Sequence, residues 1–119
     1  MTFVNFTNHP VNDPSNPWGE KQIKASAVFG KIYDLTFPQV PADADEKEVD
    51  KLAKYYVDQI IGLDPDCVMC QGEFTLSYKV TNMLKQKGIR VVAACSERNT
   101  VIIDGRKMST FVFVRYRDY

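Results

Sequence analysis

The sequence lacks an excess of charge of either sign. Among its 119 residues, fifteen Lys and Arg balance fifteen Asp and Glu, so the formal net charge is zero. Proteins that bind long DNA or RNA usually carry a basic excess, because neutralisation of phosphates drives their affinity. We therefore expect no long nucleic acid as a partner. A small ligand with a few phosphates needs only a local cluster of arginines.

The sequence also lacks any long apolar run. No stretch approaches the roughly 18 apolar residues that a membrane-spanning helix needs. Residues Met1–Phe6 lack the basic start and the apolar core of a signal peptide and are typical of a first strand. Because 45% of the residues are hydrophobic and 25% charged, we expect one ordinary globular domain over residues 1–119, without a membrane partner.

Cysteine and histidine are scarce. Three cysteines, an odd number, fit a reducing compartment and predict a cytoplasmic location. Cys67 and Cys70 have the spacing of a redox or zinc pair, but they lie in an apolar strand pattern, where residues three apart point to opposite faces. We therefore interpret both as core residues. Since His9 is the single histidine, a His-rich metal site is excluded.

Sequence motifs for common cofactors are absent too. The chain has no glycine-rich dinucleotide fingerprint, no Walker-type phosphate loop and no nucleophile elbow. We therefore expect neither a nucleotide cofactor nor a metal.

What the sequence does contain is an alternation of strand and helix patterns. Strands are predicted at residues 2–7, 31–37, 66–71 and 89–95, and helices at residues 17–29, 46–61 and 74–87. Asn16 with Pro17 predicts the start of the first helix, and Asp45 with Glu48 forms a capping box for the second. After the fourth strand, residues 100–103 and 109–116 flank a hairpin turn at Asp104-Gly105.

This order predicts an α/β fold with three layers and a mainly parallel sheet that ends in a β-hairpin. Right-handed crossovers leave few topologies for such a chain. We favour the flavodoxin-like order, in which the first and third strands are neighbours at a switch point.

Polar residues follow the predicted strands. They are Thr7, Asn8 and His9 after the first strand, Gln71, Gly72, Glu73 and Thr75 after the third, and Ser96 and Arg98 after the fourth. Because ligands of open parallel sheets bind beyond the carboxyl ends of the strands, these residues form the candidate site. We expect residues 100–103 to run back down the sheet and residues 109–116 to return. That path brings Arg115 and Arg117 to the same edge, on one face, unless they only solvate an edge strand.

Several of these residues have two interpretations. His9 is the one side chain that titrates near neutral pH without help and is a candidate proton donor, or it only hydrogen-bonds its loop. Glu73 is a second proton carrier or favours the start of a helix. Arg98 binds a phosphate or pairs with Glu97. Trp18 stacks on a nucleobase or attaches the first helix to the core.

Three motifs in the C-terminal half carry a family resemblance. They are Gln71-Gly72-Glu73, Ser96-Glu97-Arg98 and Val114-Arg115-Tyr116-Arg117-Asp118-Tyr119. In this order they resemble the Q-G-(D/E), (T/S)-(T/E)-R and V-R-(F/Y)-R-x-Y motifs of small CRISPR-associated proteins of type III loci, a group that includes ring nucleases. The N-terminal half is similar in architecture only. The chain departs from that pattern by an extra stretch at residues 11–17 and by Ala94-Cys95 before Ser96, and both changes fall at the candidate site.

The resemblance implies a Rossmann-like homodimer that recognises cyclic oligoadenylate, the second messenger of type III systems. The first hypothesis that the resemblance implies is a ring nuclease, which cuts this ring without a metal, through its own ribose 2′-hydroxyl, and so switches off type III signalling. The alternative is a related protein that only sequesters the ring. Cutting requires in-line placement, charge stabilisation and proton transfer. The implied catalytic residues are His9, Glu73 and Arg98, and the implied ligand-binding residues are Thr7, Asn8, Gln71, Gly72, Thr75, Ser96, Arg115 and Arg117.

Two hypotheses from other classes stay open. A nucleoside-processing enzyme would use Glu73 as a nucleophile toward a ribose carbon. An interaction subunit would use the polar edge to bind a protein and would respond to no nucleotide.

Overall fold

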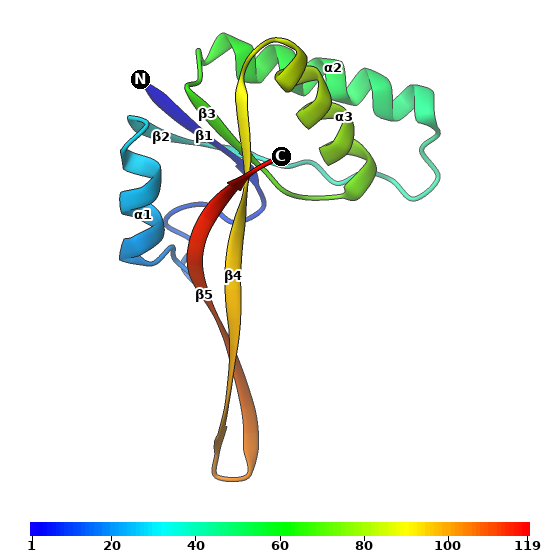
Figure 1. Ribbon diagram of the computed structural model, residues 1–119. Helices are drawn as coiled ribbons and strands as arrows, with labels where there is room; N and C mark the ends of the chain where they lie inside the picture. The colour runs from blue at the N-terminus through cyan, green and yellow to red at the C-terminus, as the bar shows by residue number, and fades with distance from the viewer.

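The computed structural model describes residues 1–119 as a five-stranded sheet with three helices (Figure 1). In chain order the elements are β1 (Thr2–Thr7), α1 (Glu20–Ala27), β2 (Lys31–Thr36), α2 (Glu46–Gly62), β3 (Cys67–Cys70), α3 (Phe74–Gln86), β4 (Arg90–Ile103) and β5 (Arg106–Asp118). The strand order is β2-β1-β3-β4-β5, parallel except for the antiparallel pair of β4 and β5. The predicted α/β class and the flavodoxin-like order are therefore confirmed.

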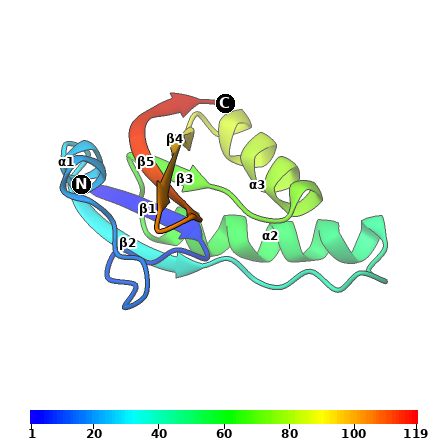
Figure 2. The same cartoon turned by 90° about the horizontal axis from the view of Figure 1, so that it is seen from below.

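The helices lie on both faces of the sheet. Figure 2 shows α2 and α3 along one face and α1 on the other. No helix has the length and apolar content needed to cross a membrane.

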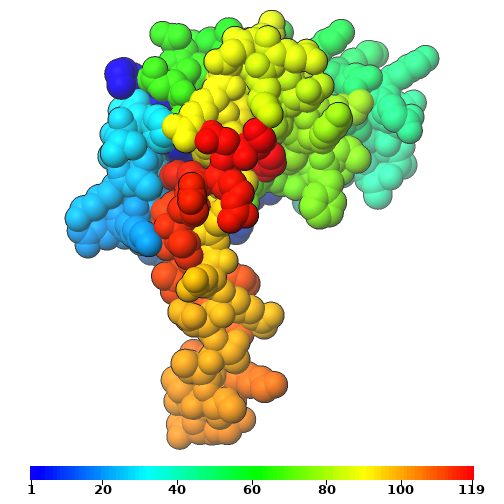
Figure 3. Space-filling view, in the orientation of Figure 1, coloured from blue at the N-terminus to red at the C-terminus, as the bar shows by residue number.

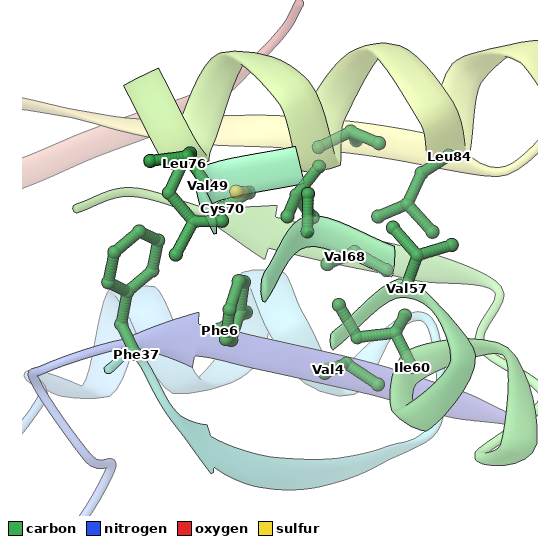
Figure 4. Packing of buried hydrophobic residues seen from close by; sticks show 13 residues of the cluster. Val4, Phe6, Phe37, Val49, Val57, Ile60, Val68, Cys70, Leu76 and Leu84 are labelled. Carbon is green, nitrogen blue, oxygen red and sulfur yellow. The ribbon is translucent and has the colours of Figure 1, made fainter. Parts of the chain in front are cut away.

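The larger part of the core lies between the sheet and the helix pair α2 and α3 (Figure 4). Phe6 from the central strand β1 is fully buried there, with its ring 4.7 Å from that of Phe37 and 5.1 Å from that of Tyr56. Ile60 of α2 and Leu84 of α3 close the same cluster. Burying large apolar side chains at helical spacing is what stabilises these two helices against the sheet.

A smaller cluster fills the other face, beneath α1 and the loop that precedes it. It consists of Phe3, Trp18, Cys67, Met69 and Val92. Since β1 and β3 are covered on both faces, β3 is continuously apolar, and in β1 the polar residues Asn5 and Thr7 are buried as well as the apolar Phe3, Val4 and Phe6. Cys67 belongs to this cluster and Cys70 to the larger one, as their spacing predicted, and both are free and buried.

The predicted caps are partly correct. Asp45 accepts a hydrogen bond from the Glu48 backbone N–H at 2.9 Å, so the start of α2 is confirmed. The predicted start of the first helix at Asn16 is wrong, because α1 begins at Glu20 after Gly19. Trp18 explains the difference: its backbone N–H donates to the carbonyl of Val11 at 3.1 Å, and this bond holds the preceding residues in a loop.

The prediction that residues 100–103 form a separate strand running back down the sheet is also wrong. Residues 90–103 form one continuous strand, β4, and the register shift at Cys95 and Ser96 leaves Val114 of the partner strand β5 as the extra residue. Asp104 and Gly105, with φ of 52° and 75°, make the predicted turn. Strand β5 therefore enters from beyond the sheet and runs back along β4. Residues 96–113, which we call the hairpin arm, project from the body as a two-stranded ribbon (Figures 1 and 3).

Candidate functional site

The first strand ends in a hydrogen-bonded network below the sheet edge. Thr7 is buried, and its hydroxyl donates to Oδ1 of Asn5 at 2.8 Å and accepts from the His9 backbone N–H at 3.0 Å. Asn5 Nδ2 in turn donates to the carbonyl of His9 at 2.9 Å and to Asp34 at 2.8 Å. Thr7 thus holds the following loop in place through these hydrogen bonds. Because its side chain is buried, it cannot contact a ligand.

His9 is held through its backbone. Its carbonyl also accepts a hydrogen bond from Trp18 Nε1 at 3.0 Å, so Trp18 acts as a core residue that attaches this loop. The side chains of Asn8 and His9 are exposed at the carboxyl edge of the sheet. Three hydrogen bonds therefore fix the backbone of His9, while its imidazole is left exposed, as a proton donor of the candidate site would need to be.

Gln71 and Gly72 follow β3 at the same edge. The Gln71 Oε1 accepts a hydrogen bond from the Ala94 backbone N–H at 2.8 Å, which ties the end of β3 to β4. Gly72 packs so closely on Phe37 that a Cβ there would lie 2.5 Å from the ring. Close packing therefore explains this glycine, and the free amide nitrogen of Gln71 is the polar group that this segment presents.

Glu73 is the N-cap of α3. Its carboxylate accepts hydrogen bonds from the backbone N–H groups of Thr75 at 2.9 Å and Leu76 at 2.8 Å, and from the Thr75 hydroxyl at 2.8 Å. The Leu76 N–H is the main reason that the pKa of Glu73 is lowered. With both oxygens engaged, Glu73 has a capping role, and nothing in its contacts prepares it to carry a proton or to attack a ribose carbon. The Thr75 hydroxyl is part of the same cap.

Replacing this cap tests its assigned role. We expect Glu73→Ala to lower the free energy of unfolding by about 1 kcal/mol, the usual cost of a lost N-cap, and Glu73→Asp to retain most of it. Because the folded-state pKa is lowered, the contribution of Glu73 is full at neutral pH and disappears as the pH falls through that value. Urea unfolding at pH 7 and near pH 3 measures both effects. If Glu73→Ala lowered the free energy of unfolding by the same amount at the two pH values, the capping role would be contradicted.

Ser96 and Arg98 lie on the face of β4 that continues from Val92 and Ala94, the side of the sheet covered by α1. Both are exposed at the base of the hairpin arm. Arg98 donates to the Ser109 hydroxyl at 3.2 Å across the ribbon and forms no ion pair with Glu97. The structure thus places Arg98 on the arm, beyond the edge of the sheet.

Arg115 and Arg117 lie on the opposite face. Tyr116 between them points toward α1, where its hydroxyl is 2.6 Å from that of Ser26. The two arginines therefore share the face directed toward α3, as their spacing predicted, and both are exposed opposite Cys95 and Ala93 of β4. The three arginines that the sequence grouped in one cluster are thus divided between two faces of the ribbon.

A groove of about 440 Å³ opens on the same side as Arg115 and Arg117, between α3, the end of β3 and the last residue of the chain. It is lined by Gln71, Gly72, Phe74, Ser77, Tyr78, Thr81, Asn82, Lys85 and Tyr119. Only Gln71 and Gly72 of these residues belong to the site predicted from the sequence. The outward spacing of Phe74, Tyr78 and Asn82 on α3, four residues apart and outside its core stripe, is the signal that would have found the groove.

Tyr119 forms one wall of this groove. Its hydroxyl donates to the carbonyl of Cys70 at 2.6 Å, its backbone N–H donates to Val91 at 3.1 Å, and burial raises its pKa. Lys85 Nζ donates to the Tyr119 carbonyl at 2.8 Å. The C-terminal segment is therefore fixed against α3, which Figure 3 shows as red atoms beside yellow-green ones.

Comparison with known proteins gives a family but no activity. A family profile matches residues 1–117. The chain belongs to the uncharacterized protein MJ1673 family. No curated protein matches it. The description of the MJ1673 family names neither a ligand nor a reaction, so the carboxyl edge and the groove beside it are the features of this member that bear on its function.

Proposed function

We propose that the protein is a cytoplasmic homodimer that binds cyclic oligoadenylate at the carboxyl edge of its sheet. The observation that carries the proposal is the position of Arg115 and Arg117 beside the groove of α3. Both guanidinium groups are exposed, and neither forms an ion pair. Guanidinium groups bind phosphates in bidentate fashion, and a few of them suffice for a short ring on a chain of zero net charge.

The motif order described above supports the same ligand. In the fold the first and last of the three segments meet at one end of the sheet, because Tyr119 bonds to Cys70, and the middle segment starts the hairpin arm two residues after Ala94, which bonds to Gln71. A set of short motifs that comes together in this way fits one binding site for one ligand.

The hairpin arm supports the dimer. Large apolar side chains are exposed along it, namely Val101, Ile102, Ile103, Met108, Phe111 and Val112. An isolated two-stranded ribbon is marginally stable in water, so a second copy that covers this surface would stabilise it. A two-fold dimer also presents each site twice, which matches a symmetric ring.

Binding without cleavage is the activity that the contacts favour. Of the three implied catalytic residues, Glu73 caps α3, and Arg98 lies on the opposite face of the ribbon from Arg115 and Arg117. No arrangement of base, acid and phosphate clamp is completed within one chain. We therefore infer sequestration of the messenger as the primary function.

Cleavage is the second candidate, and the exposed His9 favours it. The imidazole is on a rigid loop at the correct end of the sheet, free to donate a proton to a leaving oxygen. If the ring is cut, His9→Ala should lower the rate by about 100-fold or more, in line with the usual contribution of general acid catalysis, and leave the Kd unchanged. Equal losses of rate and affinity would instead make His9 a binding residue.

Incubation of the purified protein with cyclic tri-, tetra- and hexa-adenylate, with and without EDTA, tests the choice between the two. Chromatography with mass spectrometry follows the rings, and calorimetry measures their affinity. Sequestration predicts a bound ring that stays intact. Linear fragments that form despite EDTA would establish cleavage, and the absence of binding to any ring would overturn the proposal. Release of adenine from adenosine would point to the nucleoside-processing alternative.

A further inference from the structure

The groove beside α3 has the composition of a site for a flat, hydrogen-bonding ligand. Phe74 and Tyr78 are 90% and 70% exposed. They follow each other by one helical turn, so their rings line the same side of the groove. Exposed aromatic pairs are typical of surfaces that stack on a base.

The polar groups in the groove complement the edge of a base. The side chain of Asn82, one turn beyond Tyr78, forms no hydrogen bond within the protein, so both its amide oxygen and its amide nitrogen are free. Ser77 and Thr81 form the inner row, and their buried hydroxyls face the Cys70 thiol beneath the groove, so they help to form its floor. Gln71 adds the free half of its amide. The amides of Asn82 and Gln71 are therefore the polar groups that this groove offers to a ligand.

Cationic groups stand at one end of the same groove. Lys85 lies on the inner row of α3, and Arg117 precedes Tyr119 by two residues on the same face of β5. A molecule with a flat base at one end and a phosphate at the other therefore fits the order of side chains. The volume of about 440 Å³ is within the range of small-molecule sites.

We propose that this groove is a subsite for one adenine nucleotide, in which the base stacks on Tyr78 and Phe74 and bonds to Asn82. A side-chain amide pairs with adenine because its carbonyl accepts from the 6-amino group while its amino group donates to a ring nitrogen. Guanine presents two acceptors at the corresponding positions, so a single amide pairs with it less well. The inference deepens the proposed function, on which it rests, by naming the residues that distinguish the bases of the ring.

Two probes separate this inference from the proposed function. Adenosine 5′-monophosphate and guanosine 5′-monophosphate are titrated into the ¹⁵N-labelled full chain, and cyclic oligoadenylates are titrated into the wild type and three variants by calorimetry. We expect the adenine mononucleotide to shift the amide signals of residues 71–82 and the guanine one to bind about tenfold more weakly, in line with the discrimination of one bidentate pair.

The variants test the stacking and the edge contact. Tyr78→Ala should weaken cyclic oligoadenylate binding about tenfold or more, the usual value of one base stack, whereas Tyr78→Phe should retain it. Asn82→Asp should remove the preference for adenine, because a carboxylate only accepts. Tyr55→Ala is the matched control, since Tyr55 is an exposed tyrosine of α2 outside this groove.

Each outcome decides one proposal. If the rings bind and Tyr78→Ala binds them as well as the wild type, the subsite is wrong and the proposed function stands. If no ring binds but adenosine 5′-monophosphate shifts the α3 signals, the subsite is correct and the proposed function is wrong. If neither probe binds, both are wrong.

Discussion

Removal of both Arg115 and Arg117 should weaken the binding of cyclic oligoadenylate by about 100-fold or more. A hydrogen bond to a charged group contributes about 1.5–3 kcal/mol, and each 1.4 kcal/mol changes Kd tenfold. The double variant Arg115→Ala/Arg117→Ala should nevertheless fold normally, since both side chains are exposed on the ribbon. Calorimetry at two salt concentrations measures the effect, and the salt dependence of Kd should become smaller in the variant.

The hairpin arm supplies a control of the same charge. Arg106 and Lys107 lie at the start of β5, about 30 Å along the strand from Arg115 at 3.3 Å per residue, and both are exposed. Their double replacement by alanine removes two positive charges beyond the screening distance of the site. It should leave Kd nearly unchanged. Equal losses in the two double variants would show that overall charge, and not this pair, determines binding.

Replacement of the fully buried Phe6 by alanine should cost the largest free energy of any single truncation in the chain. Phe6 lies on the central strand between the rings of Phe37 and Tyr56, so its removal leaves a cavity under α2. Such truncations cost about 3–5 kcal/mol, out of a total stability of about 5–15 kcal/mol. We expect the midpoint of thermal unfolding to fall by about 10–20 °C.

Phe74→Ala is the matched control for stability, because it removes the same ring from a site that is 90% exposed. Surface substitutions of this kind usually change stability by about 0.5 kcal/mol or less. Chemical denaturation of the two variants compares them directly. A loss at Phe74 as large as that at Phe6 would contradict the assignment of the core to the interface of the sheet with α2 and α3.

The sequence predicted the parts of the fold that depend on local or periodic signals. Asp45 with Glu48 located the start of α2, and Asp104-Gly105 located the hairpin turn. The apolar run of β3 and the cluster Phe3, Val4 and Phe6 in β1 located the two strands that are covered on both faces. The cap and the turn depend on interactions between residues that are close in the sequence. The strands show a hydrophobic pattern that can be recognised without knowing which distant segments they pair with.

The path of β4 beyond Cys95 could not be predicted in that way. Residues 96–100 are polar and contain neither glycine nor proline, so they suit a loop as well as an exposed strand. What makes them a strand is the pairing with residues 109–113, a contact between distant parts of the chain. The predicted end of the fourth strand at residue 95 also led to the wrong prediction that Arg98 lies together with Arg115 and Arg117, because that prediction required the chain to reverse at the sheet edge.

The candidate site was predicted in outline and missed in detail. The polar ends of β1 and β3 do meet at one edge, but Thr7 and Glu73 bond to the backbone there, and Ser96 and Arg98 lie on the hairpin arm beyond it. Tyr119 was not predicted to line a groove, since only its bond to Cys70 brings it to α3. Local sequence shows which residues are polar, whereas tertiary hydrogen bonds determine which of them remain free for a ligand.

Native mass spectrometry of the wild-type chain mixed with cyclic tri-, tetra- and hexa-adenylate tests the central claim most directly. The technique reports the number of chains, the number of rings and the mass of the ring in the same spectrum. Our account predicts a dimer that holds one intact ring of a single preferred size and that loses it in Arg115→Ala/Arg117→Ala. A chain that carries no ring of any size, at concentrations where it is folded, would contradict the account.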